Sequence, residues 1–209
     1  MKPNELTIDN STITIKLMDN SYIIGTKFKK SGIDFKIKCC SESNPQVALY
    51  FQKLIGTYGT GAIMAWKNRS LIGFLPFYPL DCGIPKINCI CGPVDISIGK
   101  MDSISLIPLN ELKRKVLEVQ CLSVNWNYYR KGIGTAMTKY LIKWAKFQGW
   151  NKIQGCAFSD NKFMDAYKWI PSIHFWQKSG FQIDKSEEKD MGELGNVQMS
   201  DFSINLKEI

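Results

Sequence analysis

Short apolar stretches alternate with polar turns along the first third of the chain, and they predict a sheet with one helix. Residues 5–16 alternate apolar and polar positions and are rich in β-branched side chains, which predicts one or two strands. Residues 61–66 and 71–75 are apolar and flank the polar turn 67–70, a pattern typical of a β-hairpin. A helix is expected between these two regions, over about residues 45–56, with Gly56 ending it.

The second half of the chain predicts a strand–helix–strand unit. An apolar stretch over 116–124 is interpreted as one buried strand, and residues 133–148 carry an apolar face that Gly149 ends. A further strand over 153–158 would then pair in parallel with the first strand. Three more elements are expected near the C-terminus: a short helix near 172–179 and strands near 181–183 and 197–206.

Length and composition indicate one globular domain. The chain has 209 residues, of which 44% are hydrophobic and 22% charged, and we expect a single α/β (α+β) domain over residues 1–209. Residues 80–110, with three prolines and three cysteines, are expected to form an irregular insertion. No apolar run approaches the length of a membrane helix and the start lacks a signal-peptide pattern, so we expect a cytoplasmic protein.

Charge and cysteine usage narrow the candidate chemistry. The net charge of +8 favours an anionic partner, although the basic residues are dispersed rather than clustered. The three cysteines of the insertion, Cys82, Cys89 and Cys91, lack the spacing and the fourth ligand that zinc usually requires. We therefore expect reduced thiols and no metal site.

The abundance of Lys, Ile, Asn and Ser is typical of an AT-rich bacterial genome.

Residues 129–136, with the sequence Tyr-Arg-Lys-Gly-Ile-Gly-Thr-Ala, lie between the predicted strand and helix and form what we call the glycine loop. The first N–H groups of a helix have no intrahelical partner and carry partial positive charge. Arg130 and Lys131 add full charges beside them. The glycine loop therefore predicts a site for an anion such as a pyrophosphate.

Two segments resemble a known family. Residues 121–137, which include the glycine loop, resemble motif A of the GNAT superfamily of CoA-dependent N-acetyltransferases. Residues 175–181, Phe-Trp-Gln-Lys-Ser-Gly-Phe, resemble the C-terminal landmark of the same family. The resemblance implies the GNAT fold, a mixed sheet of about seven strands with one splayed parallel pair and helices on both faces. It also implies acetyl-CoA as the cosubstrate.

The resemblance assigns main-chain groups to the cofactor. In such proteins the backbone at the strand end pairs with the pantetheine arm, which implies Leu122, Ser123 and Val124 here. The N–H groups of the glycine loop would hold the pyrophosphate. The loop residues implied are Arg130, Lys131, Gly132, Ile133, Gly134, Thr135 and Ala136.

Glu118 is the candidate catalytic residue. In the predicted strand, Glu118, Gln120 and Leu122 share one face, and a carboxylate in a central strand is costly unless it is solvated or used. Its position fourteen residues before Gly132 resembles that of the glutamate general base in the histone acetyltransferase branch. The alternative is a solvated glutamate at a strand start. His174, the single histidine, is interpreted as a packed residue rather than a catalytic one.

Two positions depart from the family pattern. Tyr129 stands where the family usually has Gln or Arg, and Trp176 stands where it often has a tyrosine general acid. Trp has no transferable acid proton, so the general acid is not assigned; Tyr167 and Ser172 are alternatives.

The main prediction is an acetyltransferase acting on a primary amine of a small molecule or peptide, with no nucleic-acid or membrane partner, and with a homodimer possible. The alternatives are a non-catalytic CoA-binding sensor and a basic nucleic-acid-binding module.

Overall fold

The computed structural model describes residues 2–9, 11–20, 45–82, 105–158, 171–190 and 192–209. The described strands are β1 (Asn4–Ile8), β2 (Ser11–Leu17), β3 (Ala62–Lys67), β4 (Ser70–Pro79), β5 (Val116–Val119), β6 (Ser123–Val124), β7 (Lys152–Phe158), β8 (Gln182–Asp190) and β9 (Asn196–Asn205). The described helices are α2 (Pro45–Tyr58), α3 (Ile133–Gln148) and α5 (Ile173–Lys178), with short 3₁₀ turns η2 (Trp126–Tyr128) and η3 (Gly192–Leu194).

The strands form one mixed sheet with a single parallel pair among the described strands. Their order is β1-β2-β3-β4-β5-β7-β9-β8, and β6 lies beside β4. Only β5 and β7 are parallel, and the other pairings are antiparallel. This confirms the mixed sheet with one parallel pair. The sheet has nine strands rather than about seven, because residues 5–16 contribute two strands, β1 and β2, and the strand predicted over 116–124 is divided into β5 and β6.

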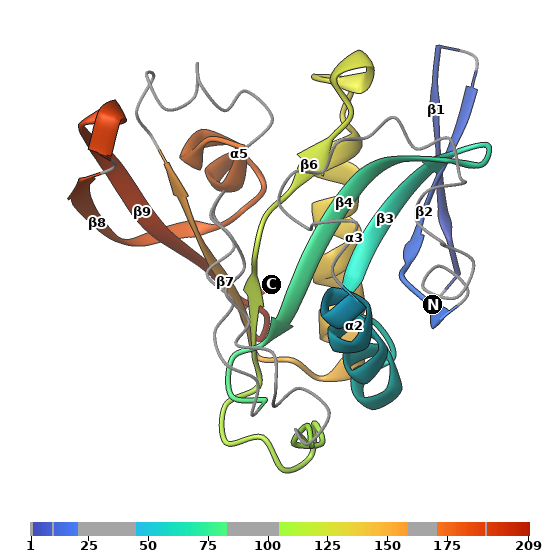
Figure 1. The fold of residues 1–209 in the computed structure, drawn as a ribbon, viewed down its shortest axis with the longest axis horizontal. Coiled ribbons are helices and arrows are strands. Elements are labelled where there is room, and N and C mark those ends of the chain that lie inside the picture. Colours follow the sequence, from blue (N-terminus) through green and yellow to red (C-terminus); the bar gives the residue numbers. More distant parts are fainter. Residues whose placement is uncertain (1, 10, 21–44, 83–104, 159–170, 191) are drawn as a thin grey trace.

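Helices cover both faces of the sheet (Figure 1). On β4 the side chains of Phe74 and Phe77 point to opposite faces. Phe74 meets Phe51 of α2, with ring centroids 5.9 Å apart, and Phe77 meets Trp144 of α3 at 5.2 Å. The cross-strand register places Phe202 on the α3 side of the sheet, and Trp176 of α5 stacks on it. Helices α3 and α5 therefore share one face, and α2 covers the other.

The single strand predicted over 116–124 is wrong, because a β-bulge divides it. Phe77 is opposite Val119 and Phe74 is opposite Ser123, so three residues of one strand face two residues of β4. Pro76 lies inside this gap and has no N–H to give to the ladder, although its carbonyl accepts a bond from the Gln120 N–H at 3.0 Å. The strand therefore pairs as two pieces, β5 and β6.

The helix expected to end at Gly56 continues to Tyr58. Its end is set by Gly59, which has a φ of +82° and donates its N–H to the Ile55 carbonyl at 2.9 Å. The hairpin is confirmed, and its turn is tighter than predicted because β3 and β4 extend to Lys67 and Ser70. The N-terminal strands, α3 and α5 are also confirmed.

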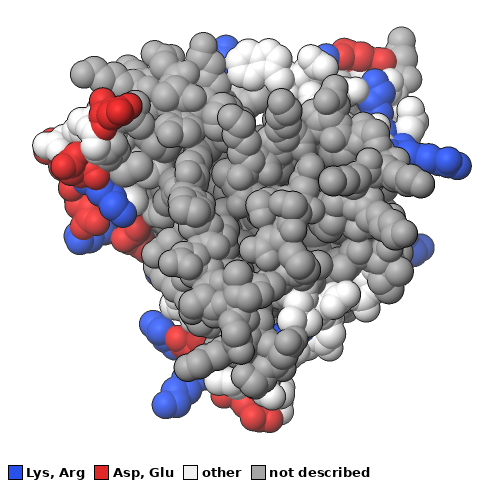
Figure 2. Space-filling model, viewed as in Figure 1, with Lys and Arg blue, Asp and Glu red and all other residues white. Residues whose placement is uncertain are grey.

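Strand β8 forms one edge of the sheet and is almost wholly exposed. Figure 2 shows acidic and basic side chains gathered on this side of the molecule. Lys185 and Glu187 form an ion pair there, and Glu188, Lys189 and Asp190 continue the charged stretch. Charged side chains along an open edge oppose pairing with another sheet. No helix in the part of the chain that the structure describes is long and apolar enough to cross a membrane.

Candidate functional site

The glycine loop opens directly onto the start of α3. Gly132 is the N-cap residue, with φ +81° and ψ −1°, and no side chain caps the helix. The first helical hydrogen bond runs from the Ala136 N–H to the Gly132 carbonyl at 3.0 Å. The N–H groups of the three residues between them have no intrahelical partner. The predicted anion site is therefore a helix start with open main-chain donors.

Each motif glycine meets a different structural requirement. Gly132 has a left-handed backbone, although a Cβ there would have no atom within 4 Å. At Gly134 there is little room for a side chain, because a Cβ would lie 3.3 Å from Leu122 Cδ2 and 3.4 Å from Phe175 Cε2. The two segments that carry the family resemblance thus meet at Gly134, with Phe175 of α5 against the first turn of α3.

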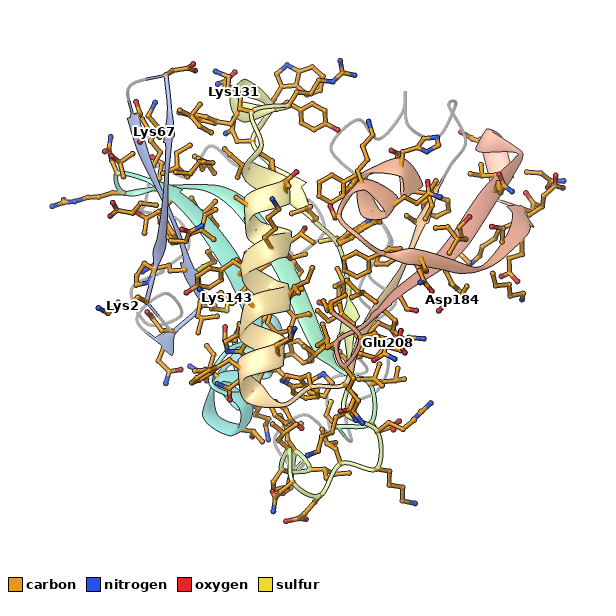
Figure 3. The ribbon with its side chains drawn as sticks, turned by 180° about the vertical axis from the view of Figure 1, so that it is seen from behind. Lys2, Lys67, Lys131, Lys143, Asp184 and Glu208 are labelled. Carbon is orange, nitrogen blue, oxygen red and sulfur yellow. The ribbon has the colours of Figure 1, made fainter. Side chains whose placement is uncertain are left out.

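Three cationic side chains lie around the glycine loop. Arg130 has a φ of +57°, and Lys131 pairs with Asp9. The ammonium groups of Lys131 and Lys67 lie 6.0 and 5.2 Å from the ring centroid of Tyr128. Figure 3 shows Lys67 and Lys131 at the end of the molecule where α3 begins. Sequence analysis did not find Lys67, since it belongs to the distant β3–β4 turn.

Tyr129 occupies the position where the family usually has Gln or Arg. Its ring stacks with that of Trp126, with centroids 5.8 Å apart and planes at 20°. Burial raises the pKa of Tyr129, and the neighbouring Arg130 charge opposes this shift. Tyr129 is therefore a neutral, partly buried aromatic group. The positive charge at this point of the glycine loop comes from the adjacent Arg130.

The predicted pantetheine segment forms one open strand edge. Ser123 and Val124 pair with Phe74 and Gly73 of β4, and the next residue, Asn125, donates its N–H to the Ile72 carbonyl at 2.7 Å. Among the described strands, none pairs with the other edge of β6. Leu122, 3% exposed, packs toward Gly134 instead of toward this edge. The free edge of β6 thus lies beside the glycine loop.

The parallel strands β5 and β7 separate at a defined residue pair. They are paired from Val116 and Lys152 to Glu118 and Gln154, and no pairing continues beyond. Toward the start of α3 the two halves of the sheet diverge (Figure 1). Glu118 and Gln154 are therefore the last paired residues before the two strands separate. A parallel pair that splays in this way is what the family resemblance implied.

Glu118 is partly buried, and side chains from both neighbouring strands hold its carboxylate. The Tyr78 hydroxyl donates to Oε1 at 3.1 Å, and the Gln154 amide donates to Oε2 at 3.4 Å. Burial, followed by the charge of Glu118, raises the pKa of Tyr78 far above its ordinary value, so Tyr78 remains a neutral donor. Glu118 is thus held by two side chains and is not fully exposed to solvent.

The structure describes three of the other candidate acid and base positions. His174, interpreted from the sequence as a packed residue, is instead exposed on α5, and its Nδ1 lies 3.1 Å from Gln177 Oε1. Trp176 is 2% exposed and stacks on Phe202, with centroids 4.3 Å apart. Ser172 precedes α5 without capping it by a side-chain hydrogen bond, and Tyr167 lies outside the described residues. Trp176 therefore belongs to the core.

Only one of the three cysteines of the predicted insertion lies in the described part of the chain. Cys82 is buried, whereas Cys89 and Cys91 lie outside the described residues. Within the described ranges, no group of three or more His, Cys, Asp or Glu side chains could hold a metal ion.

Comparison with known proteins agrees with this fold. Residues 33–181, more than half of the chain, match the family model described as the acetyltransferase (GNAT) family. An N-acetyltransferase from Staphylococcus aureus is similar in fold, with a TM-score of 0.54 at 14% identity, covering 93% of this chain and 98% of its own. A GNAT acetyltransferase from Streptococcus pneumoniae gives 0.55 at 13% identity, with 92% and 98% covered.

A third solved structure contains the cofactor. YncA from Salmonella typhimurium, solved with acetyl-CoA, gives a TM-score of 0.55 at 14% identity and covers 94% of this chain and 95% of its own. No curated protein matches the chain in sequence.

Proposed function

Because the chain belongs to the GNAT family of acetyl-CoA-dependent acetyltransferases, we propose that it transfers an acetyl group from acetyl-CoA to a primary amine, with Glu118 as the general base. The observation that carries this proposal is the position of Glu118. It is the last β5 residue before the parallel strands separate, and Tyr78 and Gln154 both donate to its carboxylate. A base held at the apex of this splay would meet an amine that enters beside the thioester.

The described residues fit an acyl-CoA. The open start of α3 and the charges of Arg130, Lys131 and Lys67 suit a pyrophosphate and a further phosphate. The free edge of β6 offers backbone groups to the amides of pantetheine. Bound in this way, acetyl-CoA would extend from the glycine loop toward Glu118 and supply a thioester as the acyl donor.

The proposed reaction is direct attack without an acyl-enzyme. Glu118 takes a proton from the ammonium form of the acceptor, and the neutral amine nitrogen attacks the acetyl carbonyl carbon. The new C–N bond forms, the C–S bond breaks, and the second amine proton leaves as the amide forms. The CoA thiolate takes a proton from solvent. Holding both reactants in line supplies much of the rate.

The test compares Glu118→Gln with the wild type. Acetyl-CoA affinity, measured by calorimetry, should be unchanged, while CoA release with an amine panel should fall about 100-fold or more. A panel of alkylamines, polyamines, amino acids and peptides covers small-molecule and peptide acceptors. Unchanged turnover in Glu118→Gln would contradict the role of Glu118. Acetyl-CoA binding without turnover of any amine by the wild type would favour the CoA-binding sensor.

A further inference from the structure

Trp126 presents a large aromatic ring to solvent just before the glycine loop. It is 62% exposed and lies in η2, three residues before Tyr129 begins the loop. Single exposed apolar side chains are common in soluble proteins, and Phe147, 75% exposed near the end of α3, is one of this kind. Exposure alone therefore marks no binding site, and Trp126 is distinguished by how its ring is held.

Hydrogen bonds fix the turn that carries Trp126. Asn125 donates its N–H to the Ile72 carbonyl at 2.7 Å, and its side-chain oxygen accepts the Asn127 N–H at 3.0 Å. The Tyr129 N–H then donates to the Trp126 carbonyl at 3.1 Å, and the two rings stack with centroids 5.8 Å apart and planes at 20°. We call these two rings the aromatic platform. Tyr129 lies against one face of the indole, and the opposite face is open to solvent.

The aromatic platform borders the predicted pyrophosphate site. Tyr129 precedes Gly132 by three residues, a span of at most about 10 Å. Tyr128 links the two platform residues to the cations, because the ammonium groups of Lys131 and Lys67 lie 6.0 and 5.2 Å from its ring centroid. Figure 3 shows both lysines at this end of the molecule. An open aromatic face and cationic groups therefore lie together beside the start of α3, which is the combination that binds the base and the phosphates of a nucleotide.

We infer that the adenine ring of acetyl-CoA stacks on the open face of Trp126. This inference rests on the proposed function, because it starts from a pyrophosphate bound at the glycine loop. In CoA the adenosine follows the pyrophosphate directly, so the base is carried to the surface beside the loop. The stack with Tyr129 and the hydrogen-bonded turn hold the indole in place before the ligand arrives, which lowers the entropy cost of binding. The aromatic platform thus selects a thioester carried on a nucleotide over one carried on phosphopantetheine alone.

The test compares two ligands by calorimetry and requires no acceptor. Acetyl-CoA and S-acetyl-4′-phosphopantetheine share the thioester arm, but only acetyl-CoA carries the base. Trp126→Ala should weaken acetyl-CoA binding about tenfold, the effect of one base stacked on an aromatic side chain, and should leave the affinity for S-acetyl-4′-phosphopantetheine within about twofold. Trp126→Phe keeps an aromatic face and should retain most of the acetyl-CoA affinity.

Phe147→Ala is the matched control. It removes another exposed aromatic ring, near the far end of α3 and about 21 Å along the helix from Ile133. This variant should bind both ligands as the wild type does.

A spectroscopic readout reports on the indole itself in a protein without substitutions. Labelling with 5-fluorotryptophan gives a fluorine NMR signal for each of the six tryptophans, and the Trp126 signal is the one absent from Trp126→Phe. Acetyl-CoA should shift this signal, because the π-system of a stacked base changes the magnetic environment of the indole. Pyrophosphate alone binds at the glycine loop without a base and should leave the Trp126 signal nearly unmoved.

The inference would be overturned by unchanged acetyl-CoA affinity in Trp126→Ala, by equal weakening of both ligands, or by a Trp126 signal that pyrophosphate moves as far as acetyl-CoA does. Oligothymidylate binding that is lost in Trp126→Ala while acetyl-CoA affinity is unchanged would overturn it too, and would assign the ring to a single-stranded nucleic acid. The proposed transfer reaction fails separately. Acetyl-CoA that binds through Trp126 without turnover of any amine would contradict acetyl transfer and leave the stacking in place.

Discussion

Tyr78 and Glu118 lie directly opposite each other in the β4–β5 pairing, and the Tyr78 hydroxyl donates to Glu118 Oε1 at 3.1 Å. Tyr78 is 2% exposed, and burial keeps its phenol neutral by raising its pKa. A neutral donor stabilises the ionised form of a carboxylate and fixes one of its oxygens. The pair therefore fixes one oxygen of the proposed base, and we propose that Tyr78 acts as a positioning residue.

Tyr78→Phe removes this donor and keeps the ring. We expect kcat/KM to fall about 10- to 100-fold, since a hydrogen bond to a charged group contributes about 1.5–3 kcal/mol. The basic limb of the pH profile should not move, because the raised pKa of Tyr78 keeps the phenol from titrating in the working range. A pH series of kcat/KM measures both the loss and the position of the basic limb.

Tyr140→Phe is the control for Tyr78→Phe. Tyr140 lies on α3, is 5% exposed and donates its hydroxyl to the Lys2 carbonyl at 2.9 Å. Removing that hydroxyl should cost about 1 kcal/mol of stability and leave kcat/KM unchanged. If both variants kept the kcat/KM of the wild type, Tyr78 would have a structural role alone.

The two ends of α3 provide a matched test of the glycine loop. Gly132 and Gly149 have φ values of +81° and +83°, and a Cβ at either would meet no atom within 4 Å. Gly132→Ala and Gly149→Ala should therefore each cost about 1–2 kcal/mol through backbone strain alone. Only Gly132→Ala should weaken acetyl-CoA binding in calorimetry, because only its end of the helix faces the proposed pyrophosphate site. Equal weakening in both variants would indicate a general loss of fold.

Local patterns were sufficient to predict much of the fold. The apolar alternation and the polar turn predicted the N-terminal strands and the β3–β4 hairpin, since these elements depend on residues near in sequence. The glycine loop predicted the start of α3 because a left-handed Gly132 and an uncapped helix start are themselves local features. The family resemblance then supplied the splayed parallel pair.

Features that depend on distant residues were missed. The division of the predicted 116–124 strand follows from Pro76, which interrupts the ladder from the opposite strand. Tyr78 and Gln154 reach Glu118 only through the strand register, and Lys67 reaches Tyr128 only through folding. No spacing within one segment records such contacts. They become predictable only when the pairing partners of β5 are known.

The Asp81–Arg114 pair predicts a pH-dependent contribution to stability. Both guanidinium contacts are 2.7 Å long, and the hydrogen bond from Arg114 lowers the pKa of Asp81 below its ordinary value of 3.8. A lowered pKa stabilises the fold above that value, and the contribution is lost as the pH falls through the folded-state pKa. Arg114→Gln should therefore lower the melting temperature slightly at pH 7, and the difference should shrink as the pH falls below 3.8.

High salt should reduce the same difference, because the side chain of Arg114 is 62% exposed and that of Asp81 31% exposed. A difference in melting temperature that persisted unchanged at low pH and in high salt would show that Arg114 stabilises the fold by packing instead.

Trp176 is predicted to act by packing and not as a general acid. It stacks on Phe202 at 4.3 Å with planes at 17°, and Phe181 meets it edge-on at 5.3 Å. Trp176→Ala should cost about 3–5 kcal/mol in urea unfolding, whereas Trp176→Phe keeps an aromatic ring on Phe202 and should cost less. Trp176→Phe should retain kcat within about twofold and the same pH profile, because an indole has no acid proton to lose. A large loss of kcat in a well-folded Trp176→Phe protein would mean that the ring contributes to the site and not only to the core.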